Sequence, residues 1–356
     1  MSATSSKTAC RKQSRKESEN MTDQLLERAA NLLRAVPGWP ETHVTFYDLN
    51  PVLHDPEVVE HLARLIADEW RDRGVTFIAM LDARGFIIGA RVAQLLGLPM
   101  TMIRKKGKLP PPTLSFTYKL EYGTATMEIA DDGSIKGQHV LILDDLLATG
   151  GTSEAAVELV YKAGGKVAGF ACITELPALG GRGKLLSVPV QSLITIVDGV
   201  KMIDAIYCVD ILTLDTNTDP EQLLLVDRQG DVPGISMPGG KIDPGESITV
   251  ASIRELWEEV HCNAKQVFYL GTLCGVGRDP RGNYVSIVVA ARVDGKDAIG
   301  EVIDGKSKTE VRRVIRPDLL ESIGTYAFPD HLDFLRVAWP EILTAQAERE
   351  KPALVS

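Results

Sequence analysis

The stretch Val140-Leu-Ile-Leu-Asp-Asp-Leu-Leu-Ala-Thr-Gly-Gly-Thr152 decides the fold of this chain. Its apolar start, Val140 to Leu143, predicts a buried parallel strand that ends in two carboxylates, Asp144 and Asp145. A helix is predicted over Ser153 to Ala163. The turn between strand and helix consists of small residues: Ala148, Thr149, Gly150, Gly151 and Thr152. Ligands of open α/β sheets bind outside the carboxyl ends of the strands, so the pattern predicts an α/β fold with a ligand site at this turn.

The composition of the turn suits a sugar phosphate. Its glycines allow the backbone to wrap around an anion, and the N-terminus of the following helix adds a positive dipole end. The hydroxyls of Thr149 and Thr152 are donors for phosphate oxygens. Asp144 and Asp145 are acceptors for two neighbouring sugar hydroxyls, or ligands for a divalent ion. The residues therefore predict a site for a ribose 5-phosphate unit; the alternative is an ordinary strand–turn–helix.

Four segments of the chain, this turn included, resemble motifs of the type I phosphoribosyltransferases. The other three are Leu81–Phe86 (LDARGF), Ile103–Pro110 (IRKKGKLP) and Leu120–Gly123 (LEYG). Their order narrows the resemblance to the adenine phosphoribosyltransferase family, over about Leu25 to Leu193. It implies a mostly parallel sheet with flanking helices and a hood over the base. The implied reaction is attack of adenine on phosphoribosyl pyrophosphate, which gives AMP and pyrophosphate.

The same resemblance implies a role for each matching residue. Glu121 would act at the reacting centre, and Asp144 and Asp145 would hold the ribose hydroxyls. Arg84 and Lys105, with Mg²⁺, would stabilise the leaving pyrophosphate. The remaining implied substrate contacts are Thr45, Tyr47, Lys108, Tyr122, Ala148, Thr149, Gly150, Gly151 and Thr152.

Two segments near this predicted site carry further expectations. Val44 to Asp48 is identified with the hood, and Tyr47 stands where the family usually has Arg, which leaves another purine open as the substrate. Lys105 to Lys119 is polar and rich in Pro. Its length and basic residues predict a lid that closes on phosphates, the alternative being a solvated charge run.

A different pattern begins after a junction predicted at Val197 to Met202. Strand-like segments are followed by a Gly- and Pro-rich loop and a helix predicted over Ser247 to Val260. Glu255 and Glu259 are four residues apart and share one face of that helix, with Glu258 beside them. Clustered carboxylates suit Mg²⁺ or Mn²⁺. The alternative is a solvated acidic helix face.

The spacing of Gly240, Glu246 and the segment Arg254–Glu259 (RELWEE) resembles the Nudix box. This resemblance implies an α/β/α sandwich that hydrolyses a nucleoside diphosphate derivative. The metals would be held by Glu255, Glu258, Glu259 and the carbonyl of Gly239, with Glu258 and Glu259 as catalytic residues. His261 replaces the usual final Gly, and we expect it to alter the end of the helix, where a left-handed residue is preferred.

Two later segments resemble the ADP-ribose pyrophosphatase branch of the Nudix family. They are Gly277–Gly282 (GRDPRG) and Tyr326–His331 (YAFPDH). Arg278 and Arg281 are predicted to contact phosphate or ribose, and the alternative is a charged hairpin turn. The implied products from an ADP-ribose-like substrate are AMP and ribose 5-phosphate.

The composition agrees with a two-domain enzyme. At 356 residues the chain is long for a single core, and we predict domains over 21–200 and 201–345 with tails over 1–20, predicted to be disordered, and 346–356. The net charge of −9 argues against a nucleic-acid partner, and no apolar run is long enough for a membrane span.

The cysteines and the family resemblances complete the prediction. The five cysteines are scattered, which predicts free thiols and a cytoplasmic protein. The transferase resemblance implies a homodimer. Two overall functions stay open: a bifunctional enzyme, and an adenine phosphoribosyltransferase regulated by a non-catalytic Nudix sensor.

Overall fold

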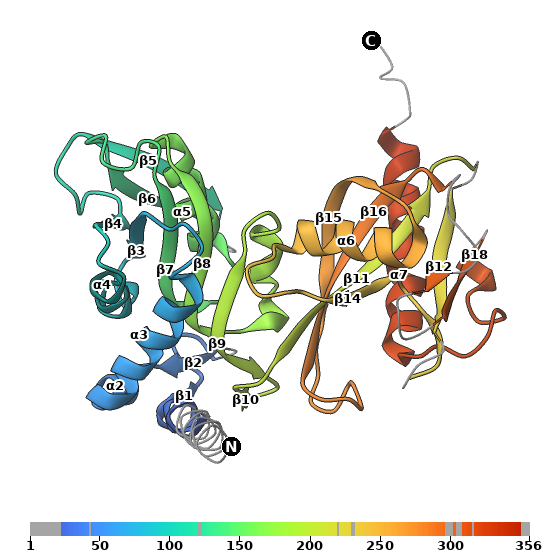
Figure 1. Ribbon diagram of the computed structural model, residues 1–356, viewed down its shortest axis with the longest axis horizontal. Coiled ribbons are helices and arrows are strands. Elements are labelled where there is room, and N and C mark those ends of the chain that lie inside the picture. The colour runs from blue at the N-terminus through green and yellow to red at the C-terminus, as the bar shows by residue number, and fades with distance from the viewer. Residues whose placement is uncertain are drawn as a thin grey trace, which may run out of the picture. The chain divides into compact units, whose positions relative to one another are not determined.

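The computed structural model describes residues 23–42, 44–119, 123–218, 221–228, 232–295, 302–303, 308–314 and 317–349. The chain divides into two compact units, Met1–Lys184 with Val188–Ala205 and Leu185–Ser187 with Ile206–Ser356. Each unit is built on its own sheet (Figure 1). No helix of the described ranges is long and apolar enough to cross a bilayer. The cysteines of the described ranges, Cys172, Cys208, Cys262 and Cys274, form no disulfide with one another. The tail predicted over 1–20 lies outside the described residues.

The first unit contains an eight-stranded sheet in the order β10-β9-β8-β7-β3-β4-β6-β5. Its strands are β3 (Phe77–Leu81), β4 (Met100–Lys105), β5 (Thr113–Lys119), β6 (Thr124–Ala130), β7 (His139–Leu147), β8 (Lys166–Glu175), β9 (Val190–Val197) and β10 (Val200–Met202). Strands β9, β8, β7, β3 and β4 are parallel, whereas β10, β6 and β5 pair antiparallel at the two edges. The mostly parallel sheet is confirmed.

Helices cover this sheet and leave the carboxyl ends of its strands accessible. Residues 23–32 are helical, and the further helices are α2 (Asn50–Leu53), α3 (Pro56–Trp70), α4 (Gly85–Leu96) and α5 (Gly151–Lys162), with short 3-10 turns over Pro177–Leu179 and Gly181–Lys184. The apolar faces of helix 23–32, α3 and α4 pack together on the side of β7 that carries Leu141 and Leu143. Val140 and Ile142 point to the other side and are also fully buried. Burial on both faces explains the unbroken apolar run of this strand.

A separate two-stranded hairpin, β1 (Arg34–Pro37) with β2 (Thr45–Asp48), forms the hood. It corrects one predicted boundary. The apolar spacing of Leu25, Leu26, Ala29, Leu32 and Leu33 predicts an amphipathic helix over Thr22 to Ala35, but the helix ends at residue 32 and Ala35 pairs with Tyr47 in the hairpin. Pairing with a distant strand therefore overrides the helical pattern at this end.

The segment predicted as a continuous lid loop, Lys105 to Lys119, is also different. Its second half forms β5, which pairs with β6 along its whole length, from Thr113 opposite Ala130 to Lys119 opposite Thr124. The prediction of a loop over these residues is wrong. The β-branched and aromatic residues of β5 alternate in a way that suits a strand, and only the part before Thr113 remains as a connecting loop.

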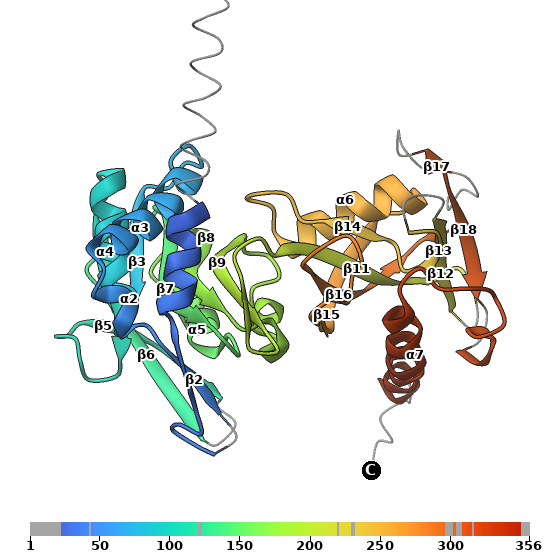
Figure 2. The ribbon, with the colours of Figure 1, turned by 90° about the horizontal axis from the view of Figure 1, so that it is seen from below.

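The second unit has a sheet in the order β15-β16-β11-β12-β18-β17, with β13 paired to β12 and β14 to β11. Its strands are β11 (Ile206–Asp215), β12 (Gln222–Arg228), β13 (Gly234–Ser236), β14 (Gly239–Lys241), β15 (Ala264–Leu273), β16 (Tyr284–Val293), β17 (Val302–Ile303) and β18 (Lys308–Val314). The helices are α6 (Ile248–Val260) and α7 (Pro329–Arg349), with a 3-10 turn over Pro317–Leu319. Figure 2 shows α6 and α7 on opposite faces of the sheet, which confirms the α/β/α architecture.

Both ends of α6 are well defined. The hydroxyl of Ser247 accepts a hydrogen bond from the N–H of Val250, as an N-cap does. His261 ends the helix with φ 55° and ψ 31°, in the left-handed region that the box glycine usually supplies. His261 therefore adopts the backbone conformation in which Gly is preferred, at the steric cost that a Cβ brings to it. At the other end of the unit, α7 continues through Gln346, the predicted start of the C-terminal tail, to Arg349.

One close contact in the first unit yields a stability prediction. A Cβ added to Gly169 of β8 would lie 1.8 Å from Cη2 of Trp70, a buried side chain whose Nε1–H donates to Oε1 of Gln191 (2.9 Å). We expect Gly169→Ala to destabilise the protein by about 1–3 kcal/mol, the usual effect of overpacking. Thermal unfolding of Gly169→Ala, Trp70→Phe and the double variant checks this. The smaller ring should relieve the clash, so strictly additive effects would contradict the contact.

Candidate active sites

The turn after β7 forms a wall of a pocket of about 270 Å³ in the first unit. The pocket brings together many of the predicted residues: Arg84, Lys105, Asp144, Asp145, Ala148, Thr149, Gly150, Gly151 and Thr152. It is completed by residues that the sequence analysis did not select: Asp82, Ala83, Tyr118, Met127, Leu146 and Ser153. The carboxyl ends of the parallel strands β3 and β7 meet here, and α5 begins at the same place, so acids, amides and a helix N-terminus face one cavity.

The shape of this turn depends on a contact between two backbone segments. Gly150 has a φ of 77°, and a Cβ on it would lie 2.6 Å from the carbonyl oxygen of Gly181. A Cβ on Gly181 would in turn lie 2.3 Å from the carbonyl oxygen of Ala148. The segment that carries Gly181 is held by a buried ion pair, in which Arg182 donates to both carboxylate oxygens of Glu175 (2.7 and 2.9 Å). The carboxylate of Glu175 is therefore occupied in supporting the turn.

The two acids above the turn are arranged differently from one another. Asp144 is buried, and burial together with the adjacent charge of Asp145 raises its pKa well above the ordinary value. Its Oδ1 accepts a hydrogen bond from the backbone N–H of Asp145 (2.9 Å). The Asp145 carboxylate forms an ion pair with Nη2 of Arg84 (2.9 Å). The pair thus presents accepting oxygens beside a cation, an arrangement that can hold sugar hydroxyls next to an anionic group.

The hood and Arg84 enclose a second cavity of about 400 Å³. The guanidinium carbon of Arg84 lies 5.1 Å from the ring centroid of Phe46, and Trp39 meets the same ring edge-on at 4.5 Å. Phe46 and Asp48 line this cavity. The sequence analysis missed Phe46 and Trp39. The alternation of β2 was the available signal, because residues 46 and 48 share one face of the strand and 45 and 47 share the other.

The remaining predicted contacts of the first unit lie elsewhere. Tyr47 packs against the main apolar core, where burial raises the pKa of its hydroxyl, and Thr45 is exposed. Lys108 is exposed, and its carbonyl accepts a hydrogen bond from Arg104 (3.4 Å). None of these three side chains lines either cavity. Glu121 and Tyr122 lie outside the described residues.

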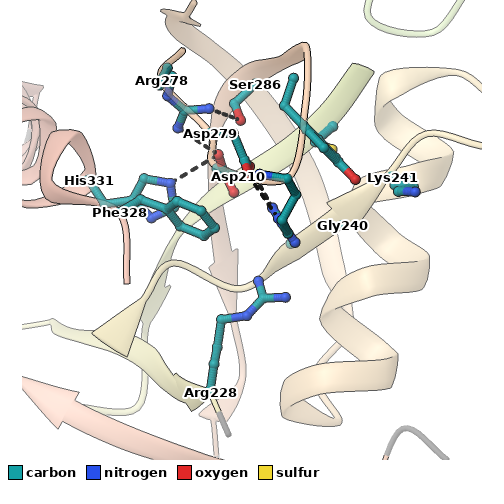
Figure 3. Close-up of a pocket in the computed structure, with 13 residues that line it drawn as sticks. Asp210, Arg228, Gly240, Lys241, Arg278, Asp279, Ser286, Phe328 and His331 are labelled. Carbon is teal, nitrogen blue, oxygen red and sulfur yellow. Dashed lines mark hydrogen bonds and ion pairs between the residues drawn. The ribbon is translucent and has the colours of Figure 1, made fainter. Parts of the chain in front are cut away.

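The second unit has a pocket of about 190 Å³ beside β14 and the first turn of α7 (Figure 3). Arg278 and Arg281 line it, as does Gly239. The other lining residues were not predicted as contacts. Gly240, Asp279, Phe328 and His331 lie in the motifs of the Nudix resemblance, whereas Cys208, Asp210, Arg228, Lys241, Tyr284 and Ser286 lie outside them. Arginines surround the ring of Phe328, with the guanidinium carbons of Arg278 and Arg281 at 5.9 and 5.2 Å from its centroid. A cationic pocket with aromatic walls suits a nucleotide.

The two predicted arginines are held in place by acids of the same unit. Arg281 donates to both oxygens of Asp279 (2.9 and 2.6 Å). Arg278 donates from Nε to Asp330 and from Nη1 to the hydroxyl of Ser286 (2.9 Å). Both guanidinium groups are therefore oriented before any ligand arrives, which reduces the entropy cost of binding an anion.

The acidic residues of α6 lie next to this pocket. The carboxylate of Glu259 is buried and accepts a hydrogen bond from the N–H of Gly239 (2.9 Å). Burial, with added repulsion from Glu255 and Asp210, raises the pKa of Glu259 to about 7. Glu255 is also buried, and burial raises its pKa. A Cβ on Gly240 would lie 2.3 Å from Oε1 of Glu255, so a larger residue there would displace this carboxylate from its position.

An arginine of the same helix neutralises part of this charge. Arg254 donates to Glu255 (2.5 Å) and to Glu258 (3.3 Å), and its other nitrogens bind Glu246 (3.0 and 2.9 Å). Glu258 is half exposed. Within the described ranges, no three side chains of His, Cys, Asp or Glu converge as metal ligands do. The donors nevertheless fit a hard divalent cation in their chemistry, because a buried carboxylate with a raised pKa is stabilised by such an ion.

Comparisons with known proteins agree with this division of the chain. Residues 50–198 match the family model of the phosphoribosyl transferase domain, and residues 207–332 match that of the NUDIX domain. An adenine phosphoribosyltransferase of Mycolicibacterium gilvum is 46% identical over 173 residues, which cover 48% of this chain and 96% of that protein. The corresponding protein of Streptomyces coelicolor is 43% identical over 184 residues, 51% of this chain and 99% of its own length.

A solved structure matches a similar share of this chain. The crystal structure of adenine phosphoribosyltransferase from Thermoanaerobacter pseudethanolicus is 42% identical, with a TM-score of 0.47, and covers 48% of this chain and 99% of that one.

The raised pKa of Glu259 predicts a pH-dependent stability. Between its ordinary pKa of 4.5 and about 7, the folded protein keeps a proton that the unfolded chain has lost, so stability falls as pH rises through this window. Without metal, Glu259→Gln should therefore be more stable than the parent at pH 8, by roughly 3 kcal/mol, and equal to it near pH 4. Scanning calorimetry in a chelator measures the difference. Glu258→Gln is the matched control, and an equal gain there would contradict a specific role of burial.

Proposed function

The chain belongs to the adenine phosphoribosyltransferase family through its first half and carries a NUDIX domain in its second, and on that premise we propose a bifunctional enzyme that forms AMP at two sites. The first site converts adenine and phosphoribosyl pyrophosphate into AMP and pyrophosphate. The second hydrolyses ADP-ribose, or a similar nucleoside diphosphate derivative, to AMP and ribose 5-phosphate. The observation that carries the proposal is that each unit combines an anion-binding pocket with carboxylates. Asp144 and Asp145 line the first pocket, and Glu259 and Glu255 lie against Gly239 and Gly240, which line the second.

In the first reaction N9 of adenine attacks C1 of the ribose, the bond from C1 to pyrophosphate breaks, and the N9 proton is lost. The turn Ala148–Thr152 would bind the 5-phosphate through its amides and hydroxyls. Asp144 and Asp145 would hold the ribose hydroxyls, while Arg84 and Lys105 neutralise charge on the leaving pyrophosphate. Mg²⁺, when bound, would neutralise the remaining pyrophosphate charge. The role implied for Glu121 stays a prediction.

We assign the base to the cavity between the hood and Arg84. Phe46 offers an aromatic face there, and its contact with Arg84 connects the base side of the site to the pyrophosphate side. Tyr47 packs against the core instead, and its side chain does not line this cavity. This favours adenine as the substrate, with another purine as the alternative.

Substitutions in the hood test this assignment. We expect Phe46→Ala to raise the KM for adenine about tenfold or more, since aromatic stacking on a base contributes roughly 1–3 kcal/mol, and to leave the KM for phosphoribosyl pyrophosphate nearly unchanged. Tyr47→Phe is the matched control on the same strand and should keep the adenine preference over hypoxanthine and guanine. A change of base preference in Tyr47→Phe would show that the hydroxyl reads the base.

In the second reaction water attacks one phosphorus of the diphosphate and the P–O–P bridge breaks. Arg278 and Arg281 would bind the phosphates from the orientations that Asp330 and Asp279 impose. We propose that Glu255, Glu258 and Glu259 hold Mg²⁺, or Mn²⁺, which would activate the water. Glu258 would have to leave Arg254 to take part, a small movement for a half-exposed side chain.

Product analysis separates an enzyme from a sensor. With ADP-ribose and Mg²⁺, we expect the full chain to release equal amounts of AMP and ribose 5-phosphate. Glu259→Gln should lower the rate by at least about 100-fold while adenine phosphoribosyltransferase activity is retained. Tight binding of ADP-ribose without turnover would favour the alternative, a transferase regulated by a non-catalytic NUDIX sensor.

Two further parts of the proposal concern the assembly and its location. The family resemblance of the first half supports a homodimer. The free, scattered cysteines support a reducing compartment such as the cytoplasm.

A further inference from the structure

The first turn of α7 places a histidine in the wall of the pocket of the second unit. His331 is 1% exposed, and Figure 3 shows its ring pointing toward Asp210. Its Nδ1 accepts a hydrogen bond from the backbone N–H of Met237 (3.3 Å), so the ring proton is on Nε2, which lies 3.2 Å from Oδ2 of Asp210. Both ring nitrogens are therefore used inside the protein, and the imidazole has no free atom with which to take a proton from water.

The two hydrogen bonds of His331 hold two backbone segments that flank Gly239. Met237 is two residues before it, and Asp210 is its direct partner in the pairing of β11 with β14. Pro238, which lies between Met237 and Gly239, is also fixed, because its carbonyl accepts a hydrogen bond from the backbone N–H of Ile211 (2.8 Å). One side chain from α7 thus connects the strand that carries Asp210 to the loop that leads to Gly239.

Gly239 has little freedom of its own. A Cβ there would lie 2.0 Å from the carbonyl oxygen of Val209, and its N–H donates to Glu259 (2.9 Å). Its carbonyl direction is therefore set by the backbone on either side. On the C-terminal side that backbone is held by the β14 pairing, and on the N-terminal side by the bond from Met237 to His331.

We infer that His331 is a positioning residue, which fixes the backbone from Met237 to Gly239 so that the Gly239 carbonyl and Glu259 face one divalent cation. The inference rests on the proposed metal site of the NUDIX unit, but not on its hydrolytic activity. His331 acts through the loop and Asp210, and it does not touch the substrate. This positioning role also explains why the first turn of α7, which is distant in sequence from the Nudix box, belongs to the site.

Two substitutions separate the two hydrogen bonds of His331. In His331→Asn the amide oxygen lies near the place of Nδ1 and can still accept from Met237, whereas the bond to Asp210 is lost. In His331→Gln the longer amide nitrogen can still donate to Asp210, whereas the acceptor for Met237 is lost. A merely structural role would make both variants lose stability without a difference in metal affinity.

The measurement is titration of the full-length chain with Mn²⁺ alone, followed by electron paramagnetic resonance. Binding that disappears in Glu259→Gln is assigned to the second unit. We expect His331→Gln to weaken this binding about tenfold or more, the usual effect of a group that orients a ligand, and His331→Asn to stay within about threefold of the parent. Thermal unfolding of each variant, compared with the parent, reports whether the second unit is folded.

Each outcome has a defined meaning. Equal Mn²⁺ affinity in the parent and in folded His331→Gln would overturn the inference, and so would the absence of any Mn²⁺ site that depends on Glu259. Weaker Mn²⁺ binding in His331→Gln, found in a chain that does not hydrolyse ADP-ribose, would support the positioning role while rejecting the proposed hydrolase. If hydrolysis occurs, the Mg²⁺ concentration for half-maximal rate should rise in His331→Gln, with little change in the KM for ADP-ribose.

Discussion

The two pockets depend on places where one backbone segment touches another with no room for a side chain. In the first unit Gly150 and Gly181 bring the turn after β7 against a short 3-10 segment. In the second, Gly239 lies against the carbonyl of Val209, and Gly240 lies against the carboxylate of Glu255. An added Cβ at Gly150, Gly181 or Gly239 would come within 2.6 Å of a backbone carbonyl oxygen, so the backbone would have to move, whereas at Gly240 the carboxylate of Glu255 would have to move. The amides and carbonyls that bind anions and cations keep their directions because these contacts hold them.

Around these contacts both units place carboxylates whose charge is only partly compensated. Asp144 is buried next to Asp145, which is paired with Arg84. Glu259 is buried near Glu255 and Asp210, and Arg254 neutralises only part of that cluster. Burial out of water destabilises these charges, and a sugar hydroxyl, a cationic metal or a bound proton stabilises them again in part. Stability and ligand binding are therefore linked in the second unit through Glu259.

Much of this arrangement could be predicted from the sequence, and the errors have identifiable causes. The parallel sheet, the acids at the end of β7 and the helix with clustered glutamates follow from local patterns that are short and regular. The strand β5 inside the predicted lid segment was missed because it is stabilised by pairing with β6, which the local proline-rich sequence does not indicate. In the hood, Thr45 and Tyr47 were predicted as substrate contacts, but they lie on one face of β2, and Phe46 on the other face lines the cavity. His331 was seen only as part of a motif, since its partners lie 94 and 121 residues away.

The sequence by itself determined which chemistry each half carries: glycines and threonines before a helix, two adjacent acids after a strand, and glutamates spaced on one helical face. These are properties of residue type and short spacing, which periodicity and resemblance reveal. Only the tertiary structure decided which groups remain available to a ligand. Glu175 is paired with Arg182, and His331 with Met237 and Asp210, whereas Arg281 is oriented at its pocket by Asp279. The physical reason is that hydrogen bonds between distant segments form only when the sheets bring them together, and a buried polar group must find its partner there.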